Sequence, residues 1–469
     1  MGASRVEGAI GAVGRCARTR GRARGRGRAR GRGGRAVARA EAFASDAARA
    51  ASARGRLAVK NASEEARALL EGAKAPTTRN EEYRFTDFSA LTTAAFVGPR
   101  EDARCDASGT KVAEACARIV LVDGALDATQ SDLTNAAKAG VDVRVGEGDE
   151  TTGVQSAVRG NVFSAINSAS ASDVVVVKVA KGVKCAMPIH IVTLSTGGDS
   201  GAMRVSAPRV TIVLEEDAEL SVVEDFAGEG ETEYWQNGVC EITLAKGASM
   251  KHSLIQNHGR SATHTRTTLV TQAEGSRYEA NEVSVGGKTA RHDLNIKQLG
   301  PRTETVLGCF NLAGAEQTLD LHSKVLLDHE EGVSDQLHKC IVSAASGRGV
   351  FDGNVQVNRF AQRTDAQQLS RNLLLVPKAT VNVKPNLQII ADDVKCTHGC
   401  TVSDLEEEEL FYIRSRGLST EIARSLLVSG FGVEVINRFP GKDLRDRVNA
   451  MVRNALSRDS VEFEWTGDA

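Results

Sequence analysis

Several features that define common classes of protein are missing from this sequence. No run of roughly 18 apolar residues occurs, and the longest apolar strand pattern, Val174 to Val177, is far too short to cross a bilayer. The 9 cysteines form no closely spaced framework and no C-x-x-C pair, which disfavours a disulfide scaffold and a zinc finger. We therefore expect a soluble protein that does not contact membranes. Six cysteines are expected to be free thiols in the core or at the surface: Cys105, Cys116, Cys185, Cys240, Cys309 and Cys340.

The motifs of several enzyme classes are incomplete as well. The segment Gly286 to Thr289 reads GGKT, but Glu282 stands where a phosphate-binding loop needs its first glycine. After Gly347 and Gly349, Asp352 occupies the third glycine position of a dinucleotide-binding fingerprint. No G-x-S-x-G turn offers a nucleophile. The sequence thus predicts a protein that is not an enzyme and has no nucleotide-binding motif of its own.

Lysine, phenylalanine and tyrosine are absent from the first 40 residues, which hold 12 arginines and one acid, Glu7. This segment therefore carries a net charge of +11, and the rest of the chain carries −12 of a total of −1. Because an Ala/Gly/Arg tract has almost no apolar surface to bury, residues 1–40 are predicted to be disordered.

Two functions are compatible with this leader. An arginine-rich, acid-poor segment is typical of an organelle transit peptide that is removed after import. An RNA-binding segment would interleave aromatic residues for base stacking, and none occurs before Phe43. We favour a transit peptide cleaved between Arg35 and Ser45, and we expect no binding to nucleic acid. Composition alone separates chloroplast from mitochondrion poorly.

The rest of the chain falls into three regions by pattern. Residues 41–172 mix Ala-rich helical stretches with short apolar runs. In residues 173–400, short β-branched strands alternate with turns that recur at Asp217, Gly247 and Gly275, a spacing that favours a β-solenoid but leaves a β-sandwich open. Residues 401–469 return to a helical period, with five acids between Asp404 and Glu409 in the first helical turn, capped by Ser403.

Histidines occur in two loose groups. His252, His258 and His264 are spaced by six residues, but the turn signal at Asn257 breaks the strand register, and we expect surface or groove positions. Three others lie among acids and predict a solvated loop more than a weak metal patch: His322, His329 and His338.

The segment Lys395 to Cys400 alternates two thiols with an imidazole, at Cys396, His398 and Cys400. A strand has a side-chain period of two, so all three point to one face if this segment is extended. Sulfur and nitrogen together suit zinc, copper(I) or iron-sulfur species better than magnesium or calcium. Three ligands on one strand cannot complete the coordination of a metal ion, so a further ligand must come from elsewhere. The alternative is a pair of small hydrophobic cysteines at a turn near Gly399.

The residues around this strand resemble a known family. ADDVKCTHGCTVSDLEEEELFYIRSRGL, from Ala391 to Leu418, resembles the C-terminal signature of SufD, a subunit of the Suf iron-sulfur cluster assembly system. Similar matches cover PTTRNEEYRFTDFSAL at 76–91, QLHKCIV at 336–342, GVFDGN at 349–354 and TDAQQLSRNLLL at 364–375. The paralogue SufB carries a different, glutamate-containing sequence in place of DDVKC-x-HG. The resemblance spans Pro76 to Phe439, and with the leader it implies a plastid-targeted form in the stroma.

The resemblance also implies a fold, partners and a site. The expected fold is mainly β, a right-handed parallel β-helix core flanked by an N-terminal helical or mixed region and a C-terminal helical region. The expected partners are SufB, bound through the core, and the SufC ATPase, bound through approximately Ser403 to Phe439. Cys396 and His398 match residues implicated in building a transient cluster or binding iron at the SufB interface, with nothing permanently bound. Cys400 stands where the family usually has a small residue, so its role is doubtful.

Two other classes of function compete with a non-catalytic scaffold. A β-helix enzyme acting on polysaccharide requires carboxylates or arginines clustered along one strand face, and we find no such cluster in the sequence. An RNA-binding protein depends on the arginine-rich leader alone.

Overall fold

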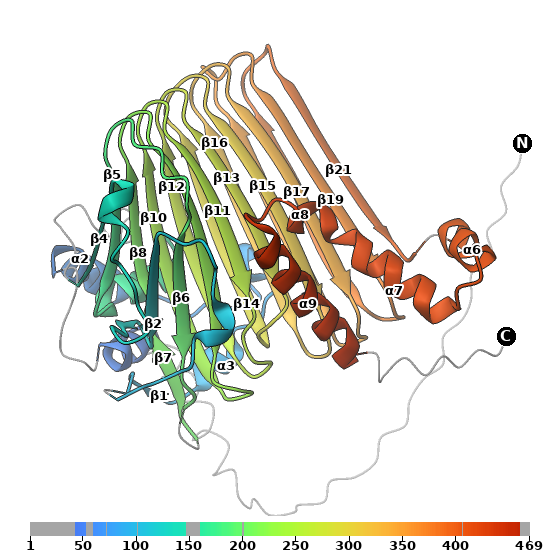
Figure 1. Ribbon diagram of the computed structural model, residues 1–469, viewed down its shortest axis with the longest axis horizontal. Helices are drawn as coiled ribbons and strands as arrows, with labels where there is room; N and C mark the ends of the chain where they lie inside the picture. Colours follow the sequence, from blue (N-terminus) through green and yellow to red (C-terminus); the bar gives the residue numbers. More distant parts are fainter. Residues whose placement is uncertain are drawn as a thin grey trace, which may run out of the picture.

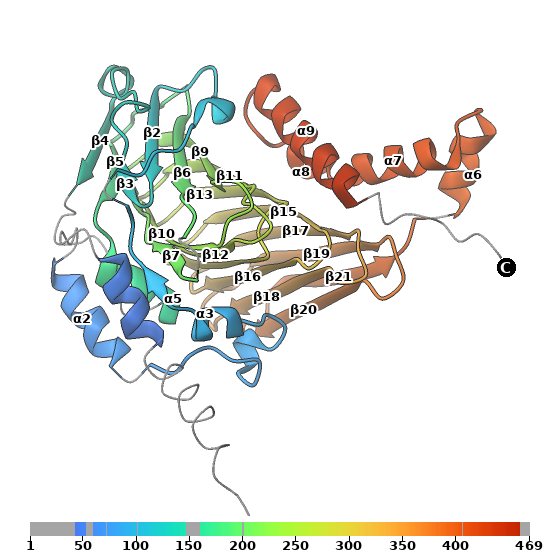
Figure 2. The ribbon, with the colours of Figure 1, turned by 90° about the horizontal axis from the view of Figure 1, so that it is seen from below.

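The computed structural model describes residues 43–52, 60–71, 73–100, 102–146, 160–198, 201–405 and 407–459. The predicted transit peptide, residues 1–40, and most of its predicted cleavage window lie outside these residues. The described chain forms a long solenoid of two facing sheets, with helices on both outer sides and beyond one end (Figures 1 and 2).

The chain passes back and forth between the two sheets. Sheet A contains β4 (Val141–Gly146), β5 (Val174–Val179), β8 (Arg209–Leu214), β10 (Tyr234–Leu244), β12 (Thr263–Gln272), β14 (Thr289–Gln298), β16 (Thr318–Leu327), β18 (Arg348–Val357) and β20 (Thr380–Ile389), with β1 (Phe96–Val97) and β7 (Met203–Ser206) beside them. Sheet B contains β2 (Ala117–Val122), β3 (Ala125–Leu126), β6 (Ile189–Ser195), β9 (Glu219–Gly228), β11 (Ser249–Gln256), β13 (Arg277–Ser284), β15 (Glu304–Ala313), β17 (Val333–Val342), β19 (Asp365–Leu374) and β21 (Lys395–Ser403). From β8 onward, each strand pairs in parallel with the strand two places later.

Aliphatic residues fill the space between the sheets, because every second residue of a strand points inward. One inward row of sheet A crosses five successive strands in register, and all of its members are buried: Ile242, Val270, Ile296, Val325 and Val355. Each rung therefore buries its inward side chains against the rungs before and after it.

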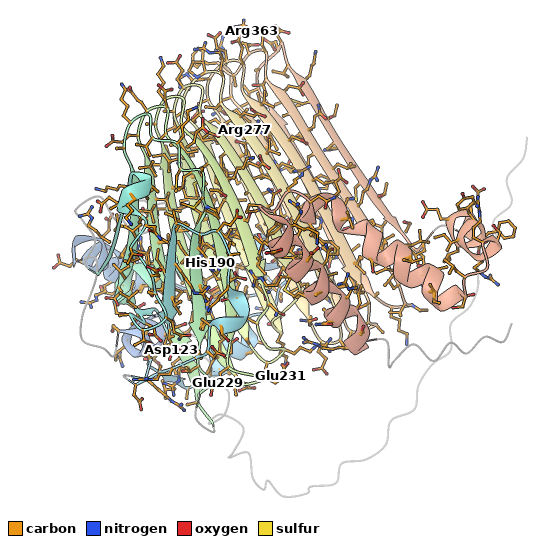
Figure 3. The ribbon with its side chains drawn as sticks, viewed as in Figure 1. Asp123, His190, Glu229, Glu231, Arg277 and Arg363 are labelled. Atoms are coloured by element: carbon orange, nitrogen blue, oxygen red, sulfur yellow. The ribbon has the colours of Figure 1, made fainter. Side chains whose placement is uncertain are left out.

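Tight turns join the strands along one edge of the solenoid, where Figure 3 places Arg363. Six successive turns each contain one residue in the left-handed region, with φ of 57° at Asp217, 68° at Gly247, 65° at Gly275, 56° at Arg302, 58° at Glu331 and 57° at Arg363. The repeated turn signals in the sequence thus mark repeated backbone geometry. The side chain of Arg363 also bonds to Glu330, in the turn one rung earlier, at 2.8 Å.

One end of the solenoid, which we call the closed end, is covered. The pairs β2·β3 and β4·β5 are antiparallel, and Leu126, Leu133 and Ala136 pack against the inward residues of the first strands. Helices α2 (Lys60–Leu70), α3 (Ser89–Thr93) and α5 (Val162–Ser170) lie on the sheet A side (Figure 2). There Phe163 and Trp235 belong to an aromatic cluster with ring centroids 5.9 Å apart. Short 3-10 helices occur at Glu81–Tyr83, Ser108–Thr110 and Ala137–Ala139.

The other end, formed by β20 and β21, we call the open end. These are the last strands of their sheets, and no strand of the described chain pairs with their outer edges. Three apolar side chains at this end are about half exposed, with exposed fractions of 45% for Ile389, 56% for Ile390 and 50% for Val402.

The C-terminal helices are α6 (Glu407–Ser415), α7 (Thr420–Phe431), α8 (Val433–Ile436) and α9 (Lys442–Asp459). Helices α8 and α9 pack on the outer face of sheet B, while α6 and α7 extend past the open end (Figures 1 and 2). Arg447 of α9 makes two hydrogen bonds of 2.9 and 2.8 Å with the buried carboxylate of Asp225. The predicted cap at Ser403 is wrong, because Ser403 is the last residue of β21; Ser419 instead caps α7 by accepting from the Ile422 N–H.

The predicted fold, a mainly β parallel β-helix core with flanking helices at both termini, is confirmed. The boundaries predicted at residues 41–172, 173–400 and 401–469 stay a prediction; β2 to β4 of the first region lie in the same two sheets as the core. None of the described helices is both long enough and apolar enough to span a lipid bilayer.

Candidate functional site

Cys396, His398 and Cys400 lie on β21, the last strand of sheet B. The register pairs these residues with Ala366, Gln368 and Ser370 of β19 respectively, and all three β19 partners are buried. All three ligand-type side chains thus share the inward face of the solenoid.

The site is uncovered because no further rung of the described chain lies beyond it. Cys396 is half-buried and packs against the main core, whereas His398 and Cys400 are exposed. The neighbouring Asp392 and Asp393 belong to the turn before β21, where the Asp393 N–H donates to Gln362 at 2.9 Å. A second protein placed against the open end would therefore meet these three side chains directly.

Neither thiol is activated by its own chain. Burial, followed by the nearby charge of Asp365, raises the pKa of Cys396 above its ordinary value. Burial also raises the pKa of Cys400. Both groups are therefore thiols at neutral pH, and a metal ion or a cationic neighbour must displace the proton before either sulfur can act as a ligand.

The three side chains also do not converge on one point. Nowhere in the described residues do three His, Cys, Asp or Glu side chains gather closely enough to hold a metal ion. The geometry thus supplies an incomplete, soft donor set on the inward face of the last strand.

Behind this strand lie polar side chains that the sequence did not indicate as part of the site. The Nδ1 of His338 lies 3.1 Å from the hydroxyl of Ser370, and its ring stacks on Phe351 at 4.4 Å. Its Nε2 and the amide oxygen of Gln368 are buried without a hydrogen-bond partner among the described residues. No local signal in the sequence identifies this, because the contacts join residues from different strands.

A cavity of about 350 Å³ lies on the outer face of the same strands, between β21 and the C-terminal helices. Leu337 and Leu369 form apolar parts of its lining, and Glu434 and Arg438 contribute charges from the helical side. Thr397, on the opposite face of β21 from the ligand-type residues, also lines it.

The prediction that His252, His258 and His264 lie at the surface or in a groove is wrong, because all three are buried. His252 lies 2.7 Å from a carboxylate oxygen of Glu224. His258 does lie in a turn, but the next turn stacks on it: a Cβ built at Gly286 would lie 2.3 Å from the His258 backbone nitrogen. Close stacking of turns thus explains Gly286, and a φ of 81° in the left-handed region explains Gly287, the second glycine of the false phosphate loop.

The solvated loop predicted for His322, His329 and His338 is correct only for His329, which lies in a turn. His322 lies on β16, 3.1 Å from the carboxylate of Asp320, and His338 is buried on β17. A β-solenoid places about half of the residues of each strand inside, so a polar residue type alone does not indicate exposure.

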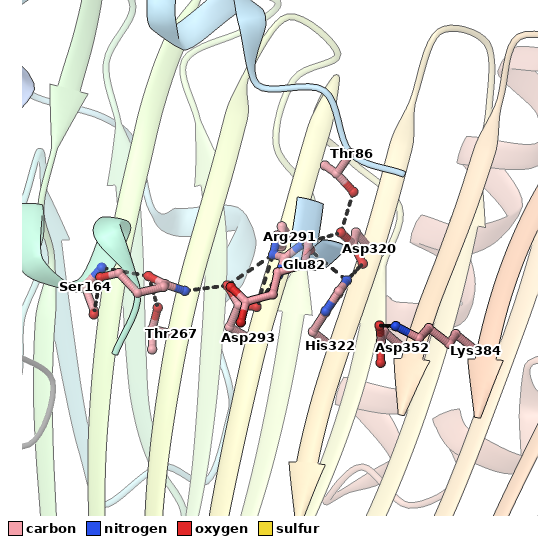
Figure 4. A network of polar contacts seen from close by, with 11 residues as sticks. Glu82, Thr86, Ser164, Thr267, Arg291, Asp293, Asp320, His322, Asp352 and Lys384 are labelled. Carbon is pink, nitrogen blue, oxygen red and sulfur yellow. Dashed lines mark hydrogen bonds and ion pairs between the residues drawn. The ribbon is translucent and has the colours of Figure 1, made fainter. Parts of the chain in front are cut away.

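The segment 76–91, which carries one of the resembling motifs, crosses the outer face of sheet A. Thr86 donates a hydrogen bond to Asp320, and Arg291 bonds to both Asp320 and Asp293, at 3.1 and 2.7 Å (Figure 4). Asp320 thus contacts the segment directly, whereas Asp293 acts through Arg291, which also donates to the carbonyl oxygen of Glu82.

Comparison with known proteins agrees with this architecture. Residues 195–431, half of the chain, match the family described as SUF system FeS cluster assembly, SufBD core domain. The chain belongs to the SufBD family. A SufBD family protein for iron-sulfur cluster assembly in Synechocystis sp. is 33% identical over 402 residues, covering 82% of this chain and 88% of that protein.

Two further relatives narrow the position within the SufBD family. The chloroplastic protein ABCI7 of Arabidopsis thaliana is 50% identical over 301 residues, or 63% of each chain, so the match spans less than two thirds of that protein. The iron-sulfur cluster assembly protein SufD of Escherichia coli is 28% identical over 386 residues, covering 81% of this chain and 89% of that protein. The chain is therefore a SufD-like member, with a role in the assembly of iron-sulfur clusters.

Proposed function

We propose that this chain is a non-catalytic scaffold subunit that pairs with SufB through its open end and presents Cys396 and His398 to a cluster under assembly. The observation that carries this proposal is the placement of both residues on the inward face of an uncovered last rung. Iron or the nascent cluster is the cargo of such a site. SufB would supply the missing ligands.

The open end has the properties of a protein interface. Strands β20 and β21 span 10 and 9 residues, and in the described chain each leaves one hydrogen-bonding edge unpaired. Exposed edges of this length invite pairing with another chain, and solenoids need a cap at each terminus. The half-exposed Ile389, Ile390 and Val402 add apolar area around the donor set.

An incomplete site suits assembly better than storage. The two thiols are protonated when the chain is alone, so affinity for metal is low until the partner closes the site. A subunit that must release its cluster gains from ligands that are separated again when the interface opens. Cys400 lies on the same face, and burial raises its thiol pKa as it does that of Cys396. Because it stands where the family usually has a small residue, the proposed site rests on Cys396 and His398.

For SufC we propose a second surface on α6 and α7. Ile422 and Leu426 lie one turn apart on α7, and both are about half exposed. Phe411 and Tyr412 of α6 are also exposed, by 73% and 60%. Exposed aromatic and aliphatic side chains of this kind are typical of protein interfaces.

The location that fits this function is the plastid stroma. The arginine-rich leader predicts import into an organelle, and the similarity to a chloroplastic relative favours the plastid over the mitochondrion.

The test is reconstitution of the chain with SufB and SufC under anaerobic conditions, followed by absorption spectroscopy of the cluster. Cys396→Ala and His398→Ala should each lower cluster yield by at least tenfold while the three subunits still co-purify. Thr397→Ala, on the other face of the same strand, is the matched control and should have no effect. If both site variants form clusters at the wild-type level, the site is elsewhere.

A separate measurement tests the SufC surface. Ile422→Asp together with Leu426→Asp should abolish co-purification with SufC and leave the pairing with SufB intact. Arg453→Asp, an exposed change on α9, is the control. If the double variant still co-purifies with both SufB and SufC, α7 is not part of the SufC interface.

A further inference from the structure

A pair of buried thiols lies at the closed end of the solenoid. Cys116 immediately precedes β2, and Cys185 lies in the segment between β5 and β6. Their sulfur atoms are 3.6 Å apart although the residues are separated by 69 positions in the chain. Within the described residues this is the only contact between two cysteine sulfurs.

The main chain fixes this approach. The Cys116 N–H donates to the carbonyl oxygen of Pro188 at 2.9 Å, and the Cys185 N–H donates to that of Glu219 at 3.0 Å. Both cysteines are therefore tied to the start of neighbouring strands of sheet B, β6 and β9. The backbone positions of both residues are thus held by the sheet, and their sulfur atoms are already in contact.

The two thiols differ in access. Cys116 is 2% exposed and Cys185 is 8% exposed, but Cys185 lies in a surface segment whose neighbours Lys184, Ala186 and Met187 are exposed. A small opening of this segment therefore uncovers Cys185 first. Burial, with the nearby Cys185 thiol as the second cause, also raises the pKa of Cys116 to about 12, which disfavours direct attack by Cys116 on an external disulfide.

We propose that Cys116 and Cys185 are a redox-active pair that forms a disulfide by exchange with a small-molecule disulfide such as oxidised glutathione. The Cys185 thiolate attacks one sulfur of glutathione disulfide and releases one glutathione. The sulfur of Cys116 then attacks the Cys185 sulfur of the mixed disulfide and releases the second glutathione. Two protein thiols are oxidised, one glutathione disulfide is reduced to two thiols, and the two protein protons end on the two glutathione molecules.

The bond would fasten β2, near the outer edge of sheet B, to the first rungs of the solenoid. It would close a long loop, the case in which a cross-link restricts the unfolded chain most. The two thiols of the open end, by contrast, cannot form a disulfide with each other. Cys396 and Cys400 lie four residues apart on an extended strand, about 13 Å between their Cα atoms, well beyond the roughly 7 Å that a disulfide tolerates.

The experiment incubates the full chain with reduced and oxidised glutathione at graded ratios, blocks free thiols, and maps disulfides by mass spectrometry under non-reducing conditions. We expect a peptide linking Cys116 to Cys185 and a protein lighter by two hydrogen atoms at that site. The melting temperature should rise by about 3–6 °C. Cys400→Ser is the control and should give the same linked peptide and the same shift.

Cys116→Ser should give only a mixed disulfide of glutathione with Cys185, and no rise in melting temperature. If this variant does not fold, Cys185→Ser serves instead and should leave Cys116 unmodified. The proposal is overturned if wild-type protein shows both residues unlinked at a glutathione ratio that modifies the exposed Cys400. A linked pair without a change in melting temperature would overturn its role in fastening the closed end.

Discussion

The two ends of this solenoid use similar residues for opposite purposes. At the closed end, Val122 is 3% exposed and Cys116 is buried. At the open end, Val402 is 50% exposed and Cys400 is exposed. The difference comes from the covering of each terminal rung. Antiparallel pairs and packed loops cover the first rung, whereas no described residue covers the last one.

This contrast sets a capped terminal rung against an uncapped one within the same fold. In a solenoid each rung is stabilised by its neighbours, so an end rung without a cap loses about half of its contacts. The closed end removes this cost within the chain. Within the described chain the open end leaves this cost in place, and its last strand carries the two thiols and the imidazole on the uncovered inward face.

The largest expected effect is on stability, and it should differ between substitutions at the two ends. Trp235→Ala should lower the free energy of unfolding by about 3–5 kcal/mol, because Trp235 is fully buried in the aromatic cluster and its Nε1 donates to Thr265 at 2.8 Å. Urea denaturation measures the change. The control is Phe360→Ala, at an exposed turn next to the open end, which should change stability by less than about 0.5 kcal/mol. Equal losses would contradict the division into two ends.

The second prediction concerns the contact that ties α9 to the early rungs. Asp225 accepts from Arg447 and lies 2.7 Å from His190. Burial alone raises the pKa of Asp225, but these partners outweigh it and hold the pKa below its ordinary value. Asp225→Asn should cost about 3 kcal/mol, because the Arg447 guanidinium, whose side chain is only 25% exposed, loses its buried counter-charge.

Hydrogen exchange of α9 measures this loss, and protection should fall in α9 before it falls in the sheets. Asp443→Asn, an exposed change in the first turn of the same helix, is the control and should leave the exchange rates unchanged. Uniform loss of protection across the chain would show that α9 is not held separately.

The third prediction tests whether the interior stays dry close to the open end. Burial lowers the pKa of His338 to about 3, against an ordinary value of 6.5, and the same holds for His258 nearer the closed end. Between these two pH values the unfolded chain binds the proton and the folded chain does not. The stability that neutral His338 contributes is therefore complete above pH 6.5 and is lost as the pH falls toward 3, at about 1.4 kcal/mol per pH unit.

Denaturation curves at about pH 7 and about pH 5 for wild type and His338→Gln isolate this slope, since the variant lacks the titrating group. The wild type should lose more stability than the variant over this range. An equal loss of stability in the two proteins would mean that water reaches His338 through the open end. The interior near the open end would then differ from the dry interior near the closed end.

The sequence predicted some of these features and not others, for physical reasons. The alternation of Cys396, His398 and Cys400 predicted a shared face, and the register with β19 places them so. The β-helix followed from the family resemblance, whereas pattern alone left a sandwich open. Exposure of the last rung could not be predicted, because it depends on the absence of a following rung and not on any residue in β21.

The prediction that three of the histidines are exposed was wrong for a related reason. Turn signals correctly placed His258 outside a strand, but its burial depends on the stacking of Gly286 from the next rung. Contacts between rungs join residues about one coil apart in the chain, and no local pattern records which residues meet.

The smallest expected effect on the isolated chain is also the sharpest test of the open end. Val402→Ala should change the stability of the free chain by less than about 0.5 kcal/mol, because half of the side chain already contacts water. Val122→Ala, the same change at the closed end, should cost about 2 kcal/mol.

Once SufB covers the open end, Val402 becomes a buried residue, and Val402→Ala should weaken binding by roughly fivefold, about 1 kcal/mol. Titration calorimetry measures this, with Thr401→Ala on the opposite face of β21 as the control. A Val402→Ala variant that bound SufB with unchanged affinity would show that the partner covers some other surface.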